Sequence, residues 1–227
     1  FKGRGGSGYS STSHGHFLFD SERNNYGDYL KTTDSDRQMS FADYGWEPQP
    51  DVDGTVNNLQ ANLSANNINW VNWAFRAAPG FFDVVTYTGQ YTWPNSFAVP
   101  HSLGSVPGMI VIKNINMSSG WTVWHKNLSS TTGKALDFLY TNAEDSHAGF
   151  FPTAPTSTEF YLGDNSNINQ QNQSYVAYVF ADTPGVIKCG TYTGTGSSQT
   201  INTGFKPKFV LTKSRSHSSD WYLMDSA

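Results

Sequence analysis

The sequence predicts an all-β protein built from tandem, jelly-roll-like β-sandwich repeats of about 105 residues. Three observations favour this class: a polar but weakly charged composition, short strand-like runs between turn clusters, and a clear internal repeat. Charged residues make up 14% and aromatic residues 15% of the chain, so its polarity comes from Asn, Ser, Thr and Gly. This mixture is typical of strands joined by Asx- and Gly-rich turns, because long surface helices need Glu, Lys and Ala.

The internal repeat is the most informative of these observations. Residues 71–89 (VNWAFRAAPGFFDVVTYTG) match residues 176–194 (VAYVFADTPGVIKCGTYTG) without a gap at an offset of 105. Farther along, residues 103–113 (LGSVPGMIVIK) resemble residues 203–213 (TGFKPKFVLTK) at an offset of 100. The change of offset indicates a loop that is about five residues shorter in the later copy.

The repeat divides the chain into three pieces. We expect residues 1–80 to be the C-terminal part of one repeat, residues 81–185 a complete repeat, and residues 186–227 the N-terminal part of a third. Residues 17–21 (FLFDS) resemble residues 222–226 (YLMDS), so the chain starts and ends near the same point of the repeat and is expected to be an excerpt of a longer array. The alternative is a permuted domain, in which the two end pieces close one unit together.

Strand-like runs follow one another at short spacing within the complete copy. Turn clusters such as Pro107-Gly108 and Gly163-Asp164-Asn165 separate them, and no window shows helical periodicity. Such short strands in about 100 residues are typical of a sandwich or jelly roll. The predicted strands are Phe82–Tyr87, Ser96–Val99, Met109–Asn114, Thr122–Lys126, Ala135–Tyr140, Glu159–Leu162 and Tyr175–Ala181.

Charge and cysteine content exclude several classes of function. The net charge of −4 and the absence of a basic stripe argue against a nucleic-acid partner. The only cysteine, Cys189, cannot form an internal disulfide bond. No apolar run reaches the length of a transmembrane helix, so membrane insertion is not expected.

Exposed aromatic residues provide one candidate binding site. Residues 34–58 are rich in Asp, Pro and Gly and form a predicted long surface excursion, where binding residues are often found. Tyr44, Trp46 and Glu47 in this excursion, with Trp93 in a separate loop, are candidates for stacking on a sugar and binding its hydroxyls. The alternative is that these aromatic rings hold the loops against the sandwich. The other tryptophans lie at repeated or strand positions and are expected to pack in the units.

Metal and catalytic motifs are weak or missing. His14 and His16 alternate along the chain and could face one way, but a polar turn explains them better. Asp51 and Asp53 only partly match a calcium loop. No nucleophile elbow, zinc-binding helix or phosphate loop is present, so we expect neither an enzyme nor a cofactor or metal.

Several motifs of the complete copy together resemble a repeat of unknown function found in large tailed-phage virion proteins. The runs FDVVTYTG, HSLGSVPGMIVIK, GWTVWHKNL, APTSTEFYLG and YVAYVFA carry the resemblance, which extends in three pieces over nearly all of the chain. It implies a non-enzymatic virion protein, a tail fibre or appendage segment, whose partners are further copies of itself, other virion proteins and a host-surface glycan. A carbohydrate-binding module and a capsid decoration protein are the alternatives, and a glycan depolymerase is the least favoured.

Overall fold

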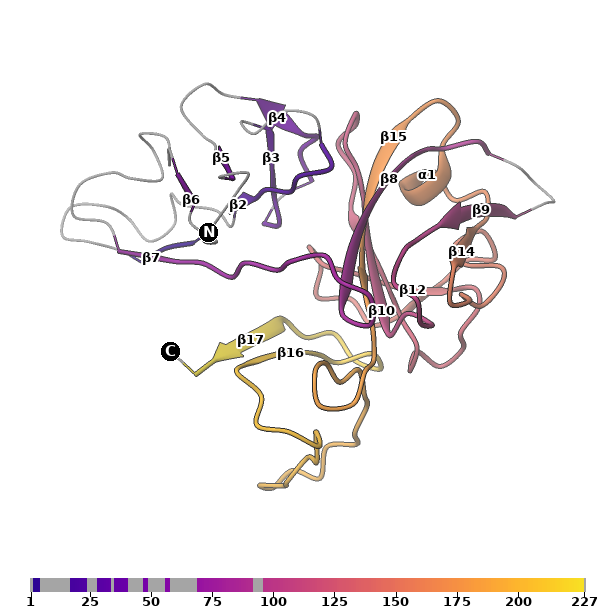
Figure 1. The fold of residues 1–227 in the computed structure, drawn as a ribbon. Helices are drawn as coiled ribbons and strands as arrows, with labels where there is room; N and C mark the ends of the chain where they lie inside the picture. The colour runs from indigo at the N-terminus through magenta and orange to yellow at the C-terminus, as the bar shows by residue number, and fades with distance from the viewer. Residues whose placement is uncertain are drawn as a thin grey trace.

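The computed structural model describes residues 2–4, 17–23, 28–33, 35–40, 47–48, 56–57, 69–91 and 96–226. These residues are nearly all β, as the composition predicted, with a single short helix among them. Strands group into one six-stranded antiparallel sheet and several two- or three-stranded sheets (Figure 1).

The six-stranded sheet lies within residues 82–180. It has the order β13-β12-β11-β10-β15-β8, and every neighbouring pair is antiparallel. The two-residue β13 lies at one edge and the seven-residue β8 at the other. Its strands are β8 (Phe82–Thr88), β10 (Met109–Asn114), β11 (Trp121–His125), β12 (Lys134–Asp137), β13 (Asp145–Ser146) and β15 (Ser174–Phe180).

One face of this sheet is covered by a strand ribbon and the helix. The ribbon pairs β9 (Phe97–Pro100) with β14 (Glu159–Leu162), and α1 spans Ser166–Asn169. Tyr87 contacts Phe160 of the ribbon with ring centroids 6.2 Å apart. The Tyr87 hydroxyl donates to the Ile168 carbonyl at 2.7 Å, and the Tyr175 hydroxyl donates to the Ser166 carbonyl at 2.8 Å. We call this the ribbon face; Figure 1 shows β9, β14 and α1 on one side of the sheet.

The opposite face carries Phe82, Val111, Lys113, Trp121 and Tyr178, because side chains alternate along a strand and these residues share cross-strand neighbours. We call it the joint face. In Figure 1 this face lies on the side of the N-terminal strands.

The N-terminal strands form three small sheets. Their bounds are β1 (Lys2–Arg4), β2 (Phe17–Leu18), β3 (Asp28–Lys31), β4 (Met39–Ser40), β5 (Glu47–Pro48), β6 (Val56–Asn57) and β7 (Asn69–Val71), with the pairs β1-β7 and β5-β6 and the sheet β2-β3-β4.

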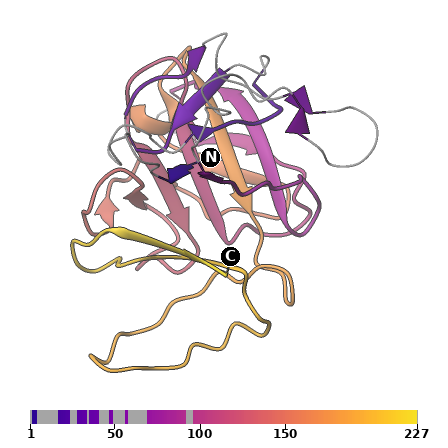
Figure 2. The same cartoon turned by 90° about the vertical axis from the view of Figure 1, so that its left-hand side faces the viewer.

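A separate hairpin ends the chain. It pairs β16 (Phe209–Lys213) with β17 (Trp221–Asp225), after a largely exposed segment that contains no strand between residues 190 and 208 (Figure 2). Tyr222, Leu223 and Met224 of this hairpin are exposed, whereas Thr122, Val123 and Trp124 at the matching positions of β11 are buried.

The small sheets repeat the pairing register of the six-stranded sheet. Except for β5-β6, each N-terminal pair and the C-terminal hairpin can be matched to a pair in that sheet at or near the offsets of the sequence repeat. The C-terminal hairpin gives the closest match: Lys213 is opposite Trp221 in β16-β17, as Lys113 is opposite Trp121 in β10-β11. The other matched pairs are Asp28–Ser40 with Lys134–Ser146, Leu18–Leu30 with Val123–Leu136, and Lys2–Val71 with Lys113–Val176.

All seven strands expected in the complete copy are present. Met109–Asn114 and Glu159–Leu162 have the expected bounds, and the others differ at one or both ends. The strand β13 and the helix α1 were not expected.

Candidate assembly interface

A buried lysine at the end of β10 fixes the N-terminal strands to the six-stranded sheet. Lys113 is 0% exposed, and its ammonium donates to the carbonyls of Ser35 and Ser119, each at 3.0 Å. The backbone is joined as well: the Ser119 amide donates to the Ser35 carbonyl at 2.8 Å, and the Gln38 amide donates to the Ile115 carbonyl at 3.1 Å. We call this set of contacts the first joint.

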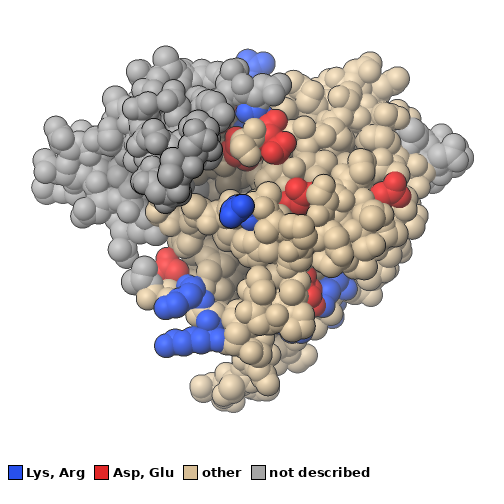
Figure 3. All heavy atoms as spheres, viewed as in Figure 1, with Lys and Arg blue, Asp and Glu red and all other residues tan. Residues whose placement is uncertain are grey.

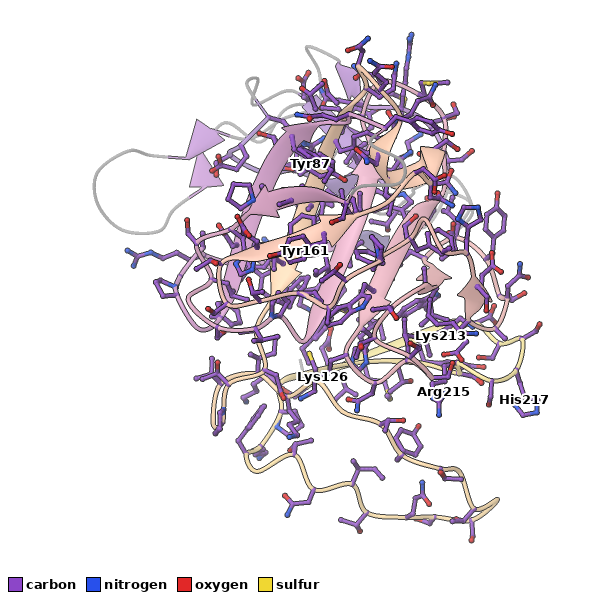
Figure 4. The ribbon with its side chains drawn as sticks, turned by 90° about the vertical axis from the view of Figure 1, so that its right-hand side faces the viewer. Tyr87, Lys126, Tyr161, Lys213, Arg215 and His217 are labelled. Carbon is purple, nitrogen blue, oxygen red and sulfur yellow. The ribbon has the colours of Figure 1, made fainter. Side chains whose placement is uncertain are left out.

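The same contacts recur between the six-stranded sheet and the C-terminal hairpin. The Lys213 ammonium donates to the Thr141 carbonyl at 3.1 Å and to the Asn142 carbonyl at 2.8 Å. The Ser219 amide donates to the Thr141 carbonyl, and the Glu144 amide donates to the Arg215 carbonyl, both at 2.8 Å. We call this the second joint; Figure 4 shows Lys213 and Arg215 together at one end of the hairpin, beside the sheet.

Three contacts match between the two joints: the lysine ammonium and the serine amide that both donate to the loop carbonyl, and the loop amide that donates back to the hairpin. On the loop side, Ser35 and Gln38 correspond to Thr141 and Glu144 at an offset of 106, and on the hairpin side the offset is 100. In both joints one lysine ammonium and two backbone amides hold a loop against the turn of the next hairpin. Because the loop side contributes carbonyls and an amide of the main chain, the joint depends little on which side chains the loop carries.

The sequence around the turn explains how the first joint is positioned. An apolar run, MIVIK, forms β10 and carries Lys113 at its end into the joint face. The Asn114 side-chain oxygen then accepts from the amides of Asn116 and Met117, at 2.9 and 3.0 Å, which closes an Asx-type turn. This turn places the Ile115 carbonyl and the Ser119 amide opposite the loop.

An aromatic stack strengthens the second joint. The rings of Phe138 and Trp221 are nearly parallel, with centroids 4.3 Å apart. The Trp221 indole nitrogen donates to the Asp137 carbonyl at 2.9 Å. Asp137 also accepts from the amides of Trp121 and Leu139, yet burial of its carboxyl raises its pKa above the ordinary value.

Charges at the rim of the second joint are arranged around one carboxylate. Glu144 lies 3.6 Å from Arg215 and 4.0 Å from Lys134. Burial favours a higher pKa for Glu144, but hydrogen bonds from Ser129 and the two positive charges lower it below its ordinary value. Burial also lowers the pKa of Lys213, against the opposing charge of Asp220.

The first joint has a polar network of its own. The Tyr178 hydroxyl and the Arg23 guanidinium both donate to the Asp20 carboxylate, each at 2.6 Å. Arg23 also donates to the Leu18 carbonyl at 3.1 Å. The side chains of Arg23 and Asp20 are 1% and 5% exposed, so this ion pair is buried between the N-terminal strands and the joint face. Burial raises the pKa of Tyr178 well above its ordinary value and keeps the phenol protonated as a donor.

Charged side chains are sparse on the described part of the face drawn in Figure 3. Figure 3 shows a few separate Lys, Arg, Asp and Glu side chains on a mainly uncharged face. Within the described ranges, no three His, Cys, Asp or Glu residues lie close enough to hold a metal ion. No described helix is long and apolar enough to cross a membrane. Burial raises the pKa of the Cys189 thiol to about 12, so the reactive thiolate is disfavoured.

The predicted sugar-binding residues fall outside the described side chains. Tyr44, Trp46 and Trp93 are not among the described residues, and Glu47 is described only as backbone of β5. His14, His16, Asp51 and Asp53 also lie outside the described ranges. The glycan hypothesis therefore stays a prediction. The packing roles expected for the strand tryptophans agree with the structure at Trp121 and Trp124, each 1% exposed.

The comparisons with known proteins give one positive result. A family model described as Domain of unknown function (DUF7483) matches residues 10–227. The chain belongs to this family. A DUF7483 match of this length runs across both expected repeat boundaries, at residues 80–81 and 185–186. No curated protein and no solved structure matches the chain.

The sequence repeat singled out the lysine of each joint but predicted no contact for it. Lys113 and Lys213 stood out because they match in the repeat, although only as scaffold residues. The loop side gave no signal, since Ser35 and Thr141 act through their carbonyl oxygens and differ in type. The Asp20 network could not be found in this way, because Arg23 and Tyr178 have no identical counterparts in the repeat, although Asp20 matches Asp225.

Proposed function

We propose that this DUF7483 chain is a non-enzymatic structural part of a tailed-phage virion, a segment of a tail fibre or other appendage. Its units are tandem β-sandwich repeats of about 105 residues, in which the six-stranded sheet and the β9-β14 ribbon are the two layers. The partners are further units of the same kind and other virion proteins. Attachment to a host-surface glycan is a second property of the same appendage.

The recurrence of the joint carries this proposal. A catalytic or ligand site needs side chains of particular chemistry, whereas the two joints reuse one lysine and main-chain groups at matched positions. Repeated units held against one another by the same fixed contacts form a rigid body. Such stiffness is what a projecting appendage requires.

Burial at the first joint supports a rigid contact. Val111, Trp121, Val123 and Tyr178 of the joint face are all at most 6% exposed, beneath the N-terminal strands. An interface between units that buries tryptophan and an ion pair resembles a domain core more than a transient contact. The virion setting itself is supported only by the sequence resemblance to phage appendage repeats. The family description names no activity.

Location on the particle tests the proposal. Antibodies raised against residues 1–227 would be applied to purified particles of the virus that encodes the chain, followed by immunogold electron microscopy. We expect label on tail fibres or other tail appendages. Label confined to the head surface would instead identify a capsid decoration protein, and particles free of the chain would contradict any virion role.

A glycan array with the purified chain tests the attachment property separately. Saturable binding that is lost in a Trp46→Ala, Trp93→Ala variant would support it. Binding without any label on particles would favour the carbohydrate-binding module over the appendage.

A further inference from the structure

Phe75 touches its own counterpart in the repeat. It matches Phe180 at the offset of 105, and the two rings are 6.1 Å apart in an edge-on arrangement. When two equal units pack about a two-fold axis, residues on the axis meet their own copies. In an open, head-to-tail stack, a residue instead meets a different residue of the next unit. The Phe75 ring also lies 5.6 Å from the Phe82 ring, but only the contact with Phe180 joins repeat counterparts, as two-fold packing would.

The joints show the same reciprocity. In the first joint a loop of residues 1–80 receives the β10-β11 hairpin, and in the second joint the matching loop of residues 81–185 receives the β16-β17 hairpin. A two-fold axis produces such an exchange if residues 1–80 and 186–227 belong to one body. Figures 1 and 2 both place the β16-β17 hairpin on the side of the six-stranded sheet where β7 lies.

The end segments also touch each other directly. The Phe209 ring at the start of β16 is 6.0 Å from the Trp73 ring and 6.4 Å from the Phe75 ring. In the repeat, Phe75 matches Phe180 and Phe209 matches Met109. Phe180 and Met109 are directly opposite each other in the β15-β10 pair. Phe75 and Phe209 thus meet as cross-strand neighbours would, although residues 72–77 form no strand in the structure.

We propose that residues 1–80 and 186–227 form one lobe, related to residues 81–185 by a pseudo-two-fold axis near Phe75 and Phe180. This corresponds to the alternative in which the two end pieces close one unit. Within this lobe, Asn72–Phe75 would add to the free edge of β16 as an antiparallel neighbour of Phe209–Thr212, in the register of β15 and β10; among the described strands, β16 pairs with β17 alone. The proposal rests on the repeat of the proposed function and defines its building block as a closed pair of lobes.

The register of this new pair follows from the existing one. Because Tyr178 is opposite Val111 and Phe180 is opposite Met109, Trp73 lies opposite Leu211 and Phe75 opposite Phe209. The strand β1 limits this pair: Lys2 lies opposite Val71, the place that Lys213 would take in the same register, so the new pair ends at Thr212. Residues of β16 and β1 then continue one another along the same edge.

A disulfide pair tests the register. In a Cys189→Ser background, Trp73→Cys and Leu211→Cys would be oxidised at low protein concentration. We expect a disulfide within one chain, seen as a monomer of faster mobility on a non-reducing gel, since directly opposite residues lie within disulfide reach. The control pair, Trp73→Cys with Val210→Cys, places the second thiol on the other face of β16 and is expected to form far less.

Amide hydrogen exchange of the unmodified chain tests the same pairing without any substitution. We expect protection of the alternate amides of residues 72–75 that face β16, at least tenfold above that of residues 190–200. A disulfide that forms only between chains, or fast exchange throughout residues 72–75, would overturn the closed lobe. Neither result bears on where antibodies label a particle, so this proposal and the virion role can fail separately.

Discussion

At the scale of single residues, Lys113 and Lys213 perform one task in two environments. Lys113 is completely buried, and its ammonium has only protein acceptors around it. Lys213 makes the same kind of contacts in a partly exposed position. Removing the charge therefore has different consequences at the two sites, because water can replace lost hydrogen bonds only where it has access.

We expect Lys113→Met to lower the free energy of unfolding by about 2 kcal/mol, the usual value for hydrogen bonds to a charged group. Lys213→Met, the matched control, should cost less than about 1 kcal/mol. Urea unfolding followed by tryptophan fluorescence measures both. Equal losses, or no loss at Lys113, would show that the lysine does not hold the first joint.

His125 should make the stability depend on pH. Burial, then the charge of Lys126, lowers its pKa to about 4, against the opposing effect of Asp182. The unfolded chain binds a proton near pH 6.5, and the folded chain does so only near pH 4, so stability is lost as the pH falls between these values. From pH 7 to pH 5 this amounts to about 2 kcal/mol.

The substitution His125→Asn isolates this effect. Its side-chain oxygen can accept from the Asn127 amide as the His125 ring does at 3.1 Å, but it does not titrate. We expect the variant to lose about 2 kcal/mol less than the wild type between pH 7 and pH 5. His217→Asn, at an exposed position, is the control and should behave as the wild type does. Parallel pH profiles for all three proteins would rule out the contribution of His125.

At the scale of elements, the long strands followed from the sequence, and the short elements did not. Runs such as MIVIK and YVAYVF are apolar over enough residues to identify β10 and β15. β13 is a two-residue exposed strand, Asp145–Ser146, with no apolar signal. α1 has four residues, and its conformation depends on the Asn165 cap and on tyrosine hydroxyls from β8 and β15, which are distant in the sequence.

The joints were predictable only on the side where side chains act. Lys113 and Lys213 match in the alignment, so the repeat drew attention to them. Ser35 and Thr141 contribute main-chain carbonyls, and any residue type can supply those. Contacts that use the main chain leave no residue pattern, which explains why the all-β class was predicted and this interface was not.

The link between the ribbon and α1 depends on one close approach of two glycines. A Cβ at Gly163 would lie 2.6 Å from the Gly149 Cα and 2.7 Å from its carbonyl oxygen. We expect Gly163→Ala to cost about 1–3 kcal/mol, because main-chain atoms cannot move aside as a flexible side chain would. Gly194→Ala is the control, as nothing lies within 4 Å of a Cβ there. Thermal unfolding compares the two, and similar melting temperatures would contradict the close approach.

At the scale of the whole molecule, the six-stranded sheet and the C-terminal hairpin differ in how much of their apolar surface is buried. Residues 81–185 contain the six-stranded sheet and most of the buried core. The β16-β17 hairpin has exposed apolar residues and is attached to that core through the second joint and the Trp221–Phe138 stack. Its stability should therefore be local, lower than that of the six-stranded sheet.

Trp221→Ala should release the hairpin while the six-stranded sheet stays folded. The substitution removes both the stack on Phe138 and the hydrogen bond to the Asp137 carbonyl, which together contribute about 2–3 kcal/mol to docking. Hydrogen exchange would then be at least tenfold faster in residues 209–225 and unchanged in β10 and β15. Trp221→Phe keeps a stacking ring without the indole donor. Its exchange rates in residues 209–225 should lie between those of the wild type and of Trp221→Ala. If β10 and β15 lost protection together with the hairpin, the molecule would unfold as one unit, and the second joint would be part of a single core.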